Sequence, residues 1–292
     1  MQRLNLDHLG TFLKVIECGS FSAAADRLRL TQPAVSLQIR QLEKRLGAAL
    51  IERVGRKAQP TAAGSELLRH AGLIDAAVTG AIDAVAHHTK NAIGPVRLGS
   101  GATASIFLLP PILSALRKRY PGLEINVTNG NTSDIVKAVE ENLIDLALVT
   151  LPVTGRMLEV SPVMKDDFVA IAAPSMALPA RLTAANLAKL PVLLPDTGAN
   201  SRRIIDRWFT RNNATAHPAM SLGYVEAIKA MVAAGLGCGI LPESALRKEE
   251  RARFVLRPLT PPLRRQLGVV IRRDKRLTRG LKATYDALLR LR

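Results

Sequence analysis

Hydrophobic residues recur at helical spacing near the start of the chain. Leu6, Leu9, Phe12, Leu13 and Ile16 stand three or four positions apart, so they would share one face of a helix. Such a face is buried against other elements, whereas the polar positions between them stay in solvent. The pattern predicts an amphipathic helix over the first part of the chain.

Two further helices are predicted from residues that start and stop helices. Ser20 or Ser22 can cap the second helix. The third would begin with Thr31 and Pro33, because proline in the first turn lacks only a backbone donor that would be unpaired there. It would stop at Gly47. Its inward-facing positions are predicted to be Val35, Ile39, Leu42 and Leu46.

The polar face of the third helix carries side chains that can read DNA. Short polar groups near the start of a helix match the hydrogen-bonding groups of base edges in the major groove. A basic stretch with Arg53 and Arg56 follows, which is typical of a β-wing lying on phosphates. Residues 1–60 are therefore predicted to form an all-α winged helix-turn-helix DNA-binding domain. The candidate DNA-binding residues of the helix are Thr31, Gln32, Pro33, Ser36, Leu37, Gln38 and Arg40.

A longer helical pattern without proline follows, and residues 61–90 are predicted to form a linker helix. A long helix with an apolar stripe after a small domain can bury that stripe against a partner, so we prefer self-association. The alternative is a helix packed on its own chain. The stripe consists of Ala63, Leu67, Ala71, Ile74, Val78, Ala81, Ile82 and Val85.

From residue 91 the pattern changes to alternating strands and helices, which predicts an α/β region whose first set is a β-α-β-α-β unit with parallel strands and right-handed crossovers. The first set has strands at 96–98, 123–127 and 144–149 and helices at 106–120 and 133–142. The second set has strands at 168–172, 192–194 and 267–271 and helices at 202–211, 226–234 and 279–291.

Several turns at the predicted carboxyl ends of strands are rich in hydroxyl and amide side chains. Ligands bind beyond these ends in open α/β sheets, where helix N-termini present free amides to anions. Ordinary helix capping explains any one turn equally well, but recurrence at equivalent strand ends favours a small-molecule pocket. The polar residues of these turns include Ser100, Thr103, Asn131, Thr132, Thr150, Ser201 and Arg202.

The chain is strongly basic, with 41 Lys and Arg against 24 Asp and Glu among 292 residues. This excess indicates a polyanionic partner, nucleic acid or an anionic membrane surface. Aromatic residues make up 3%, which argues against stacking platforms for single strands. Much of the excess lies in residues 251–292, with 13 basic and 2 acidic residues, outside the predicted DNA-binding domain. We favour a solvated face for that segment over one reached by wrapped DNA.

The sequence contains no convincing catalytic or metal-binding constellation, so we expect no enzyme, no metal and no cofactor. No histidine has a serine or acid partner at a recognisable spacing, and Asp166 and Asp167 are predicted to be a solvated pair. Cys18 and Cys238 are expected to be buried free thiols in a reducing compartment. The Gly-rich stretch at 235–239 follows a helix, misses the dinucleotide fingerprint and is interpreted as a turn into a strand. No apolar run of spanning length and no signal peptide are evident, so a cytoplasmic protein without a membrane partner is expected.

These residues together resemble a known family. Residues 12–28 (FLKVIECGSFSAAADRL), 31–36 (TQPAVS), 50–53 (LIER), 55–56 (GR) and 61–64 (TAAG) are similar to the winged helix-turn-helix of LysR-type transcriptional regulators. The remainder resembles the effector-binding region of that family. The motifs there are LP at 109–110, DLAL at 145–148, EAIK at 226–229 and GLG at 235–237.

The resemblance implies a long linker helix and two Rossmann-like subdomains with a cleft between them, as in periplasmic binding proteins. Subdomain I would take residues 91–162 and 268–292, and subdomain II residues 163–267. It also implies homodimers that pair into homotetramers on an interrupted inverted repeat in double-stranded DNA at a promoter. A small effector in the cleft would change the DNA bend, and RNA polymerase is a further possible partner.

The resemblance also implies roles for single residues. Gln32, Pro33 and Ser36 stand where the family contacts DNA, and Arg53 and Arg56 where its wing meets the backbone. Leu37 replaces a frequent arginine, so it either meets a thymine methyl or is an exposed leucine without a role. The hydroxyls, the helix N-termini and Arg202, if it points inward, favour an anionic effector. The implied effector contacts are Thr103, Thr132, Ser201, Arg202 and, bordering the cleft, Tyr224.

Two other functions remain open on sequence alone. One is a solute-binding protein or enzyme of α/β type with a helical extension, which would consume or carry its ligand. The other is a nucleoid-type protein that binds DNA without an effector, and stabilisation by a single metabolite would exclude it. The missing catalytic set speaks against an enzyme.

Overall fold

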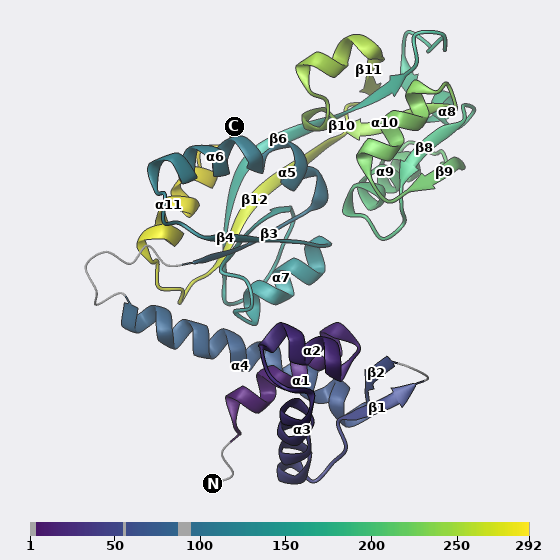
Figure 1. Cartoon of the computed structure of the whole chain (residues 1–292). Helices are drawn as coiled ribbons and strands as arrows, with labels where there is room; N and C mark the ends of the chain where they lie inside the picture. Colours follow the sequence, from purple (N-terminus) through teal and green to yellow (C-terminus); the bar gives the residue numbers. More distant parts are fainter. Residues whose placement is uncertain (1–3, 55–56, 87–94, 292) are drawn as a thin grey trace. The chain divides into compact units, whose positions relative to one another are not determined.

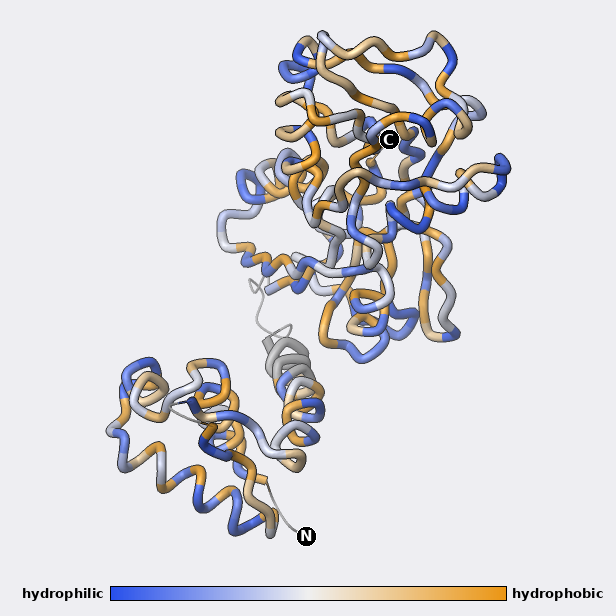
Figure 2. Tube along the Cα trace, turned by 90° about the vertical axis from the view of Figure 1, so that its right-hand side faces the viewer, coloured by the Kyte–Doolittle hydropathy of each residue, from blue (hydrophilic) through white to orange (hydrophobic). Residues whose placement is uncertain are grey.

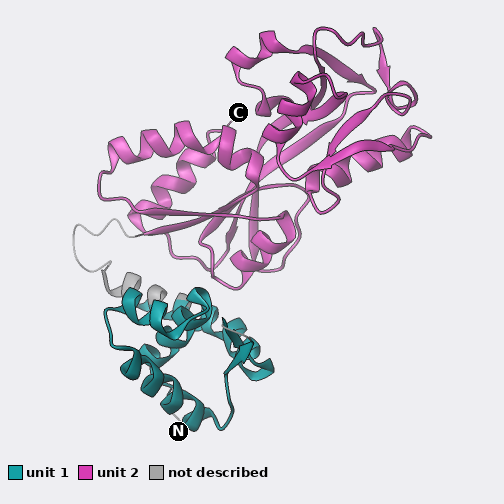
Figure 3. Ribbon diagram, turned by 45° about the vertical axis from the view of Figure 1, so that its right-hand side comes forward, with its two compact units in different colours: residues 1–82 teal, residues 83–292 magenta. Residues whose placement is uncertain are grey.

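The computed structural model describes residues 4–54, 57–86 and 95–291. The chain divides into two compact units, Met1–Ile82 and Asp83–Arg292 (Figure 3). The boundary falls within the predicted linker. Arg56 and the last part of that linker, 87–90, lie outside the described residues.

The first unit is a helical domain with a small antiparallel strand pair (Figure 1). The Thr31 hydroxyl caps the third helix by accepting a hydrogen bond from the Ala34 N–H at 3.3 Å. The Ser20 hydroxyl caps the second helix in the same way. Gly47, with φ of 70°, ends the third helix in the left-handed region that glycine adopts without strain. The elements are α1 (Leu6–Cys18), α2 (Phe21–Leu28), α3 (Gln32–Leu46), β1 (Ile51–Val54), β2 (Lys57–Pro60) and α4 (Ala62–Ala86).

The apolar faces of these helices meet in one core. Val35, Ile39 and Leu42 of α3 are buried there, as their spacing predicts, together with Phe12 of α1. The prediction that Leu46 also packs inward is wrong, since its side chain is 41% exposed. Leu46 lies in the last turn of α3, beyond the part of the helix that packs on the core.

The first half of α4 packs on its own chain. Ala71 is fully buried in the core of the N-terminal unit, and Leu67 and Ile74 pack against the same core. The alternative left open by the sequence therefore holds for this half of the stripe. Farther along, Ala81 is exposed, and the side chains of 82–86 are not among those described.

The second unit begins with a parallel sheet. β3 (Val96–Ser100) lies between β4 (Ile125–Asn129) and β5 (Leu146–Thr150), and both neighbours run parallel to it, as the alternating pattern predicts. β12 (Arg264–Arg272) adds to β5 in the antiparallel sense. The helices of this subdomain are α5 (Ala102–Phe107), α6 (Leu109–Arg119), α7 (Thr132–Glu140) and α11 (Arg279–Leu288).

Two long strands connect this subdomain to a second one (Figure 1). β6 (Leu158–Ala172) pairs antiparallel with β12, and its second half pairs with β10 and β11 of the other subdomain. The predicted boundaries at 162/163 and 267/268 thus fall inside two continuous strands. The second subdomain contains β7 (Leu182–Thr183), β8 (Val192–Pro195), β9 (Pro218–Leu222), β10 (Cys238–Pro242), β11 (Val255–Thr260), α8 (Ala184–Leu187), α9 (Asn200–Arg211) and α10 (Val225–Ala233), with 3-10 turns at Glu243–Ala245 and Lys248–Arg253.

One predicted helix is two. The helix expected at 106–120 is divided into α5 and α6 at Leu108, whose φ and ψ are −103° and −41°. Pro110 stands in the first turn of α6, and its missing N–H would leave an unpaired carbonyl inside a continuous helix. The break lets α5 begin earlier, at the end of β3.

Hydrophobic and hydrophilic stretches alternate along the trace of both units (Figure 2). Each subdomain of the second unit has apolar clusters of its own around its sheet. Among the described residues, no helix is both long enough and apolar enough to cross a membrane.

Candidate DNA interface and ligand cavity

The exposed face of α3 presents the polar groups predicted to read DNA. Gln32 and Arg40 are exposed, and Ser36 is half-buried. The Gln32 Nε2 donates a hydrogen bond to the Ser36 Oγ at 2.9 Å. The two side chains therefore form one polar surface at the start of the helix, where Gln32 is the first residue and Ser36 lies one turn later.

Four other predicted DNA-binding residues differ in their surroundings. Leu37 is 50% exposed and is not among the residues that form the core of the N-terminal unit. Gln38 is half-buried, and its Oε1 accepts a hydrogen bond from the Thr11 hydroxyl of α1, which fixes its orientation. The Thr31 hydroxyl is engaged in capping α3. Pro33 is exposed in the first turn.

The strand pair is fixed beside α3 by a residue that sequence reasoning missed. The Glu43 carboxylate accepts hydrogen bonds from the backbone N–H groups of Leu50 and Ile51, at 2.8 and 3.3 Å. Arg53 of β1 is exposed, and together with Gln32, Glu43 and other residues of α3 it lines a surface hollow. The Glu43 side chain thus sets where the wing stands relative to the recognition helix.

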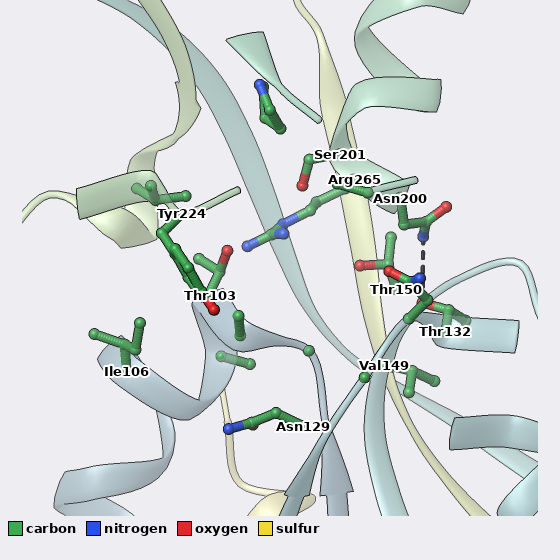
Figure 4. Close-up of a pocket in the computed structure, with 18 of the residues that line it drawn as sticks. Thr103, Ile106, Asn129, Thr132, Val149, Thr150, Asn200, Ser201, Tyr224 and Arg265 are labelled. Carbon is green, nitrogen blue, oxygen red and sulfur yellow. Dashed lines mark hydrogen bonds between the residues drawn. The ribbon is translucent and has the colours of Figure 1, made fainter. Parts of the chain in front are cut away.

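The second unit contains a cavity of about 360 Å³ between its two subdomains, within the size range of small-molecule sites. The turns after β3, β4, β8 and β9 contribute to it, as do the last residues of β5 and Leu267 of β12. Figure 4 shows the labelled side chains converging from both subdomains. Of the predicted effector residues, the structure places six around this cavity: Thr103, Asn131, Thr132, Thr150, Ser201 and Tyr224.

Two predicted effector residues do not line the cavity. Ser100 is fully buried, and its hydroxyl donates to the Leu148 carbonyl at 3.2 Å within the sheet. Arg202 is 7% exposed and turns away, with its Nε 2.9 Å from Asp206 Oδ1 and its Nη1 3.1 Å from the Pro195 carbonyl oxygen. The guanidinium of Arg202 joins α9 to the end of β8 and is not directed to a ligand.

The arginine that lines the cavity is Arg265 of β12, which the sequence did not single out. Its Nε and Nη2 lie 2.9 and 2.7 Å from Asp166 Oδ2 of β6. Ser244 completes the group, since its backbone N–H and its hydroxyl donate to the Asp166 carboxylate at 3.1 and 2.7 Å. The prediction of a solvated Asp166–Asp167 pair is wrong for Asp166, which is 2% exposed, because β6 passes between the two subdomains there and alternates its side chains.

Contacts cross between the subdomains on both sides of the cavity. The Asn200 Nδ2 of α9 lies 3.4 Å from the Thr132 Oγ1 of α7 (Figure 4). The Phe107 ring at the end of α5 faces the Lys229 Nζ of α10 at 4.8 Å and the Arg247 guanidinium at 5.7 Å. These contacts connect the two subdomains.

Many cations of the basic C-terminal segment are paired within the domain. Arg265 binds Asp166, Arg264 binds Asp167, and Lys275 lies 2.6 Å from Asp145. Paired cations contribute little net field, so this segment offers less free positive charge than its composition indicates.

The remaining chemistry-bearing residues have structural surroundings. Among the described residues, no group of His, Cys, Asp and Glu is arranged to hold a metal ion. Cys18 and Cys238 are free thiols, as predicted, and Cys238 is buried, but the prediction of burial is wrong for Cys18, which is half-buried. Burial raises the pKa of Cys238 to about 11, which keeps it a protonated, unreactive thiol at neutral pH.

The winged helix-turn-helix and the two-subdomain fold with an internal cavity define a DNA-binding transcriptional regulator. The family model described as "Bacterial regulatory helix-turn-helix protein, lysR family" matches residues 6–65, and "LysR substrate binding domain" matches residues 90–291. The chain therefore belongs to the LysR family of transcriptional regulators, as its motifs predict.

Individual relatives agree with this assignment over nearly the whole chain. The chain is 34% identical over 262 residues to the HTH-type transcriptional regulator CbbR of Rhodospirillum rubrum, covering 88% of this chain and 87% of the relative. It is 29% identical over 290 residues to the RuBisCO operon transcriptional regulator of Allochromatium vinosum, covering 98% and 96%. The crystal structure of CbnR, a LysR family transcriptional regulator, shares the fold with a TM-score of 0.76 at 20% identity, covering 97% of this chain and 99% of that chain.

Proposed function

We propose that this regulator reads a promoter through α3 and the β1–β2 wing and adjusts its DNA binding to a small anionic metabolite in the cavity. The observation that carries the proposal is the convergence of polar turns from five strand ends on one cavity of about 360 Å³. The cavity is lined by hydroxyls, amides, the cation Arg265 and the carboxylate of Asp134, and because Asp134 is exposed whereas Arg265 is buried, the enclosed charge fits a small polar anion.

The DNA-binding part of the proposal divides labour between α3 and the wing. Gln32 and Ser36 would meet base edges, whereas Arg53 would neutralise phosphates. Gln32→Ala should weaken discrimination between the operator and random DNA by about 1–3 kcal/mol. Arg53→Ala should weaken binding to both DNAs alike and reduce the salt slope by about 1.

The measurement is a titration of DNA from upstream of this gene, and of random DNA of equal length, at several salt concentrations. The RuBisCO promoter region is a useful third DNA, because the Allochromatium vinosum relative is named for that operon. The Glu43→Gln variant is a control for wing placement, because it weakens the carboxylate that holds Leu50 and Ile51 without removing a proposed DNA contact. Equal losses on specific and random DNA for both Gln32→Ala and Arg53→Ala would contradict the division.

The ligand part is tested by footprinting with and without metabolites. A metabolite that raises the unfolding temperature should also change the footprint, and should be recovered unchanged. Consumption of the metabolite would favour an enzyme, and stabilisation without any change in the footprint would contradict effector control.

Self-association is part of the same proposal. We infer a homodimer that pairs into a homotetramer on an interrupted inverted repeat, with RNA polymerase as a further partner at the promoter. The exposed Ala77 and Ala81 on the second half of α4 are small side chains that allow another helix to approach closely. Sedimentation of the intact protein with and without operator DNA measures this, and a monomer bound to a single half-site would contradict it.

A further inference from the structure

Arg265 is the one basic side chain that lines the cavity within the described part of the chain. Its guanidinium is held on one edge, where Nε and Nη2 contact Asp166 and Nη2 lies 3.4 Å from the Ser244 Oγ. The remaining amino group, Nη1, makes no hydrogen bond to the described residues, although Arg265 is only 5% exposed. Figure 4 shows Arg265 extending among Thr103, Ser201 and Tyr224. A buried guanidinium with one free amino group faces the cavity.

The helix ends around the cavity supply further unpaired donors. α7, α9 and α10 each begin at the cavity, and none of them has a side-chain cap. Asn131 is the N-cap of α7, and asparagine is a preferred capping residue, yet its side chain does not cap. The first backbone N–H groups of three helices are therefore available to an anion.

The structure assigns to Arg265 the recognition of an oxyanion: we propose that the ligand places a carboxylate or phosphate group against Nη1 of Arg265, in reach of these helix N-termini. Asp166 and Ser244 act as positioning residues, because they fix the guanidinium so that little conformational freedom is lost when the ligand binds. The inference rests on the proposed regulator function and names the ligand class and the residue that reads its charge.

The first test uses the intact protein and simple anions as probes. Inorganic phosphate, sulfate, acetate and malonate are compared with chloride at constant ionic strength, by thermal unfolding and calorimetric titration. At least one probe should raise the unfolding temperature, because a ligand that binds only the folded state stabilises it. The tetrahedral and the carboxylate probes separate a phosphate ligand from a carboxylate ligand.

The variants isolate the charge of Arg265. The double change Arg265→Gln with Asp166→Asn removes the buried pair as a neutral unit, so neither partner is left charged and alone. It should weaken probe binding about tenfold to a hundredfold, the range expected for losing a charged hydrogen bond. Arg264→Gln is the matched control, since Arg264 is the adjacent residue, is 53% exposed and does not line the cavity, and it should bind like the wild type.

Ser244→Ala tests positioning. It should weaken the probe in the wild-type background and have no further effect in the Arg265→Gln and Asp166→Asn background, whereas a merely structural role would give the same loss in both. Unchanged probe binding in the double variant, or no stabilisation by any probe, overturns the role of Arg265. If a neutral or cationic metabolite changes the footprint while the double variant responds like the wild type, the regulator function stands and only this inference fails.

Discussion

The two units of this regulator place their charges differently. Within the described residues, the N-terminal unit buries one polar side chain, Thr11, and its charged groups lie at the surface. The second unit buries five charged side chains, each with a partner: Asp145, Asp166, Arg202, Lys229 and Arg265. DNA phosphates stay hydrated and are met by mobile surface cations, whereas a small ligand enclosed by protein needs charges that are already fixed in place.

The two units also differ in how the N-termini of their helices are capped. α1, α2, α3 and α4 are capped by the side chains of Asn5, Ser20, Thr31 and Thr61. In the second unit α8 and α11 are capped by side chains, whereas α5, α7, α9 and α10, which begin at the cavity, are not; α6, which begins away from the cavity, is also uncapped. The uncapped helices at the cavity thus have first-turn N–H groups without a side-chain acceptor.

The largest expected effect concerns the buried charges. Asp166→Ala should lower the free energy of unfolding by about 3–5 kcal/mol, because it leaves the Arg265 guanidinium buried without its partner. Asp167→Ala, one residue away, should change it by no more than about 1 kcal/mol, because its pair with Arg264 is exposed. Urea unfolding followed by the fluorescence of Trp208, the only tryptophan, measures both. Equal losses for the two variants would remove the distinction between buried and surface charge.

A second effect concerns the loss of stability at acidic pH. Burial alone would raise the pKa of Asp145, but hydrogen bonds from Arg97 and Lys275 outweigh it and hold the pKa below its ordinary value. A carboxylate with a lowered pKa in the folded state adds stability above its ordinary pKa of about 4 and loses it as the pH falls through the folded value. In the Asp145→Asn variant, the free energy of unfolding should therefore fall less steeply as the pH is lowered than it does in the wild type. An equally steep fall in the variant would exclude Asp145 as the cause of the acid dependence.

The smallest effect compares a capped with an uncapped helix. Thr31→Ala should destabilise the first turn of α3 by about 1 kcal/mol, because the Ala34 N–H loses its acceptor. Asn131→Ala should leave the stability of α7 nearly unchanged, because its side chain caps nothing. Hydrogen exchange of the two first turns measures this. An equal loss at α7 would mean that Asn131 caps the free protein and competes with the ligand.

The sequence predicted the N-terminal unit well because its signals are local. The cap at Thr31, the stop at Gly47 and the spacing of Val35, Ile39 and Leu42 all lie within one helix. Prediction failed where burial depends on what packs against the helix, as for Leu46, which is exposed although its spacing matches the buried positions. The Gly-rich stretch at 235–239 did predict the strand that follows it, β10, although all five residues of that strand are buried and no alternation of polar and apolar positions marks it.

The cavity was predicted in part. Its turns could be found because each follows a strand and carries hydroxyls or amides, and six predicted residues line it. Arg202 stands in one of those turns but faces Asp206 and Pro195, since a residue in the first turn of α9 can point inward or back along the helix. No local pattern distinguishes the two orientations.

The sequence by itself determined the class of this protein. Residues 6–65 carry a helix-turn-helix whose caps, apolar faces and wing are each recognisable from residues close together in the sequence. The later alternation of strands and helices determined an α/β ligand-binding domain. Only the tertiary structure decided which charges meet. Asp166, Ser244 and Arg265 lie far apart in the chain, and β6, β12 and the turn after β10 bring them together at the cavity. The physical reason is that capping and amphipathicity act within a few residues, whereas burial and charge pairing depend on whichever strand the fold places alongside.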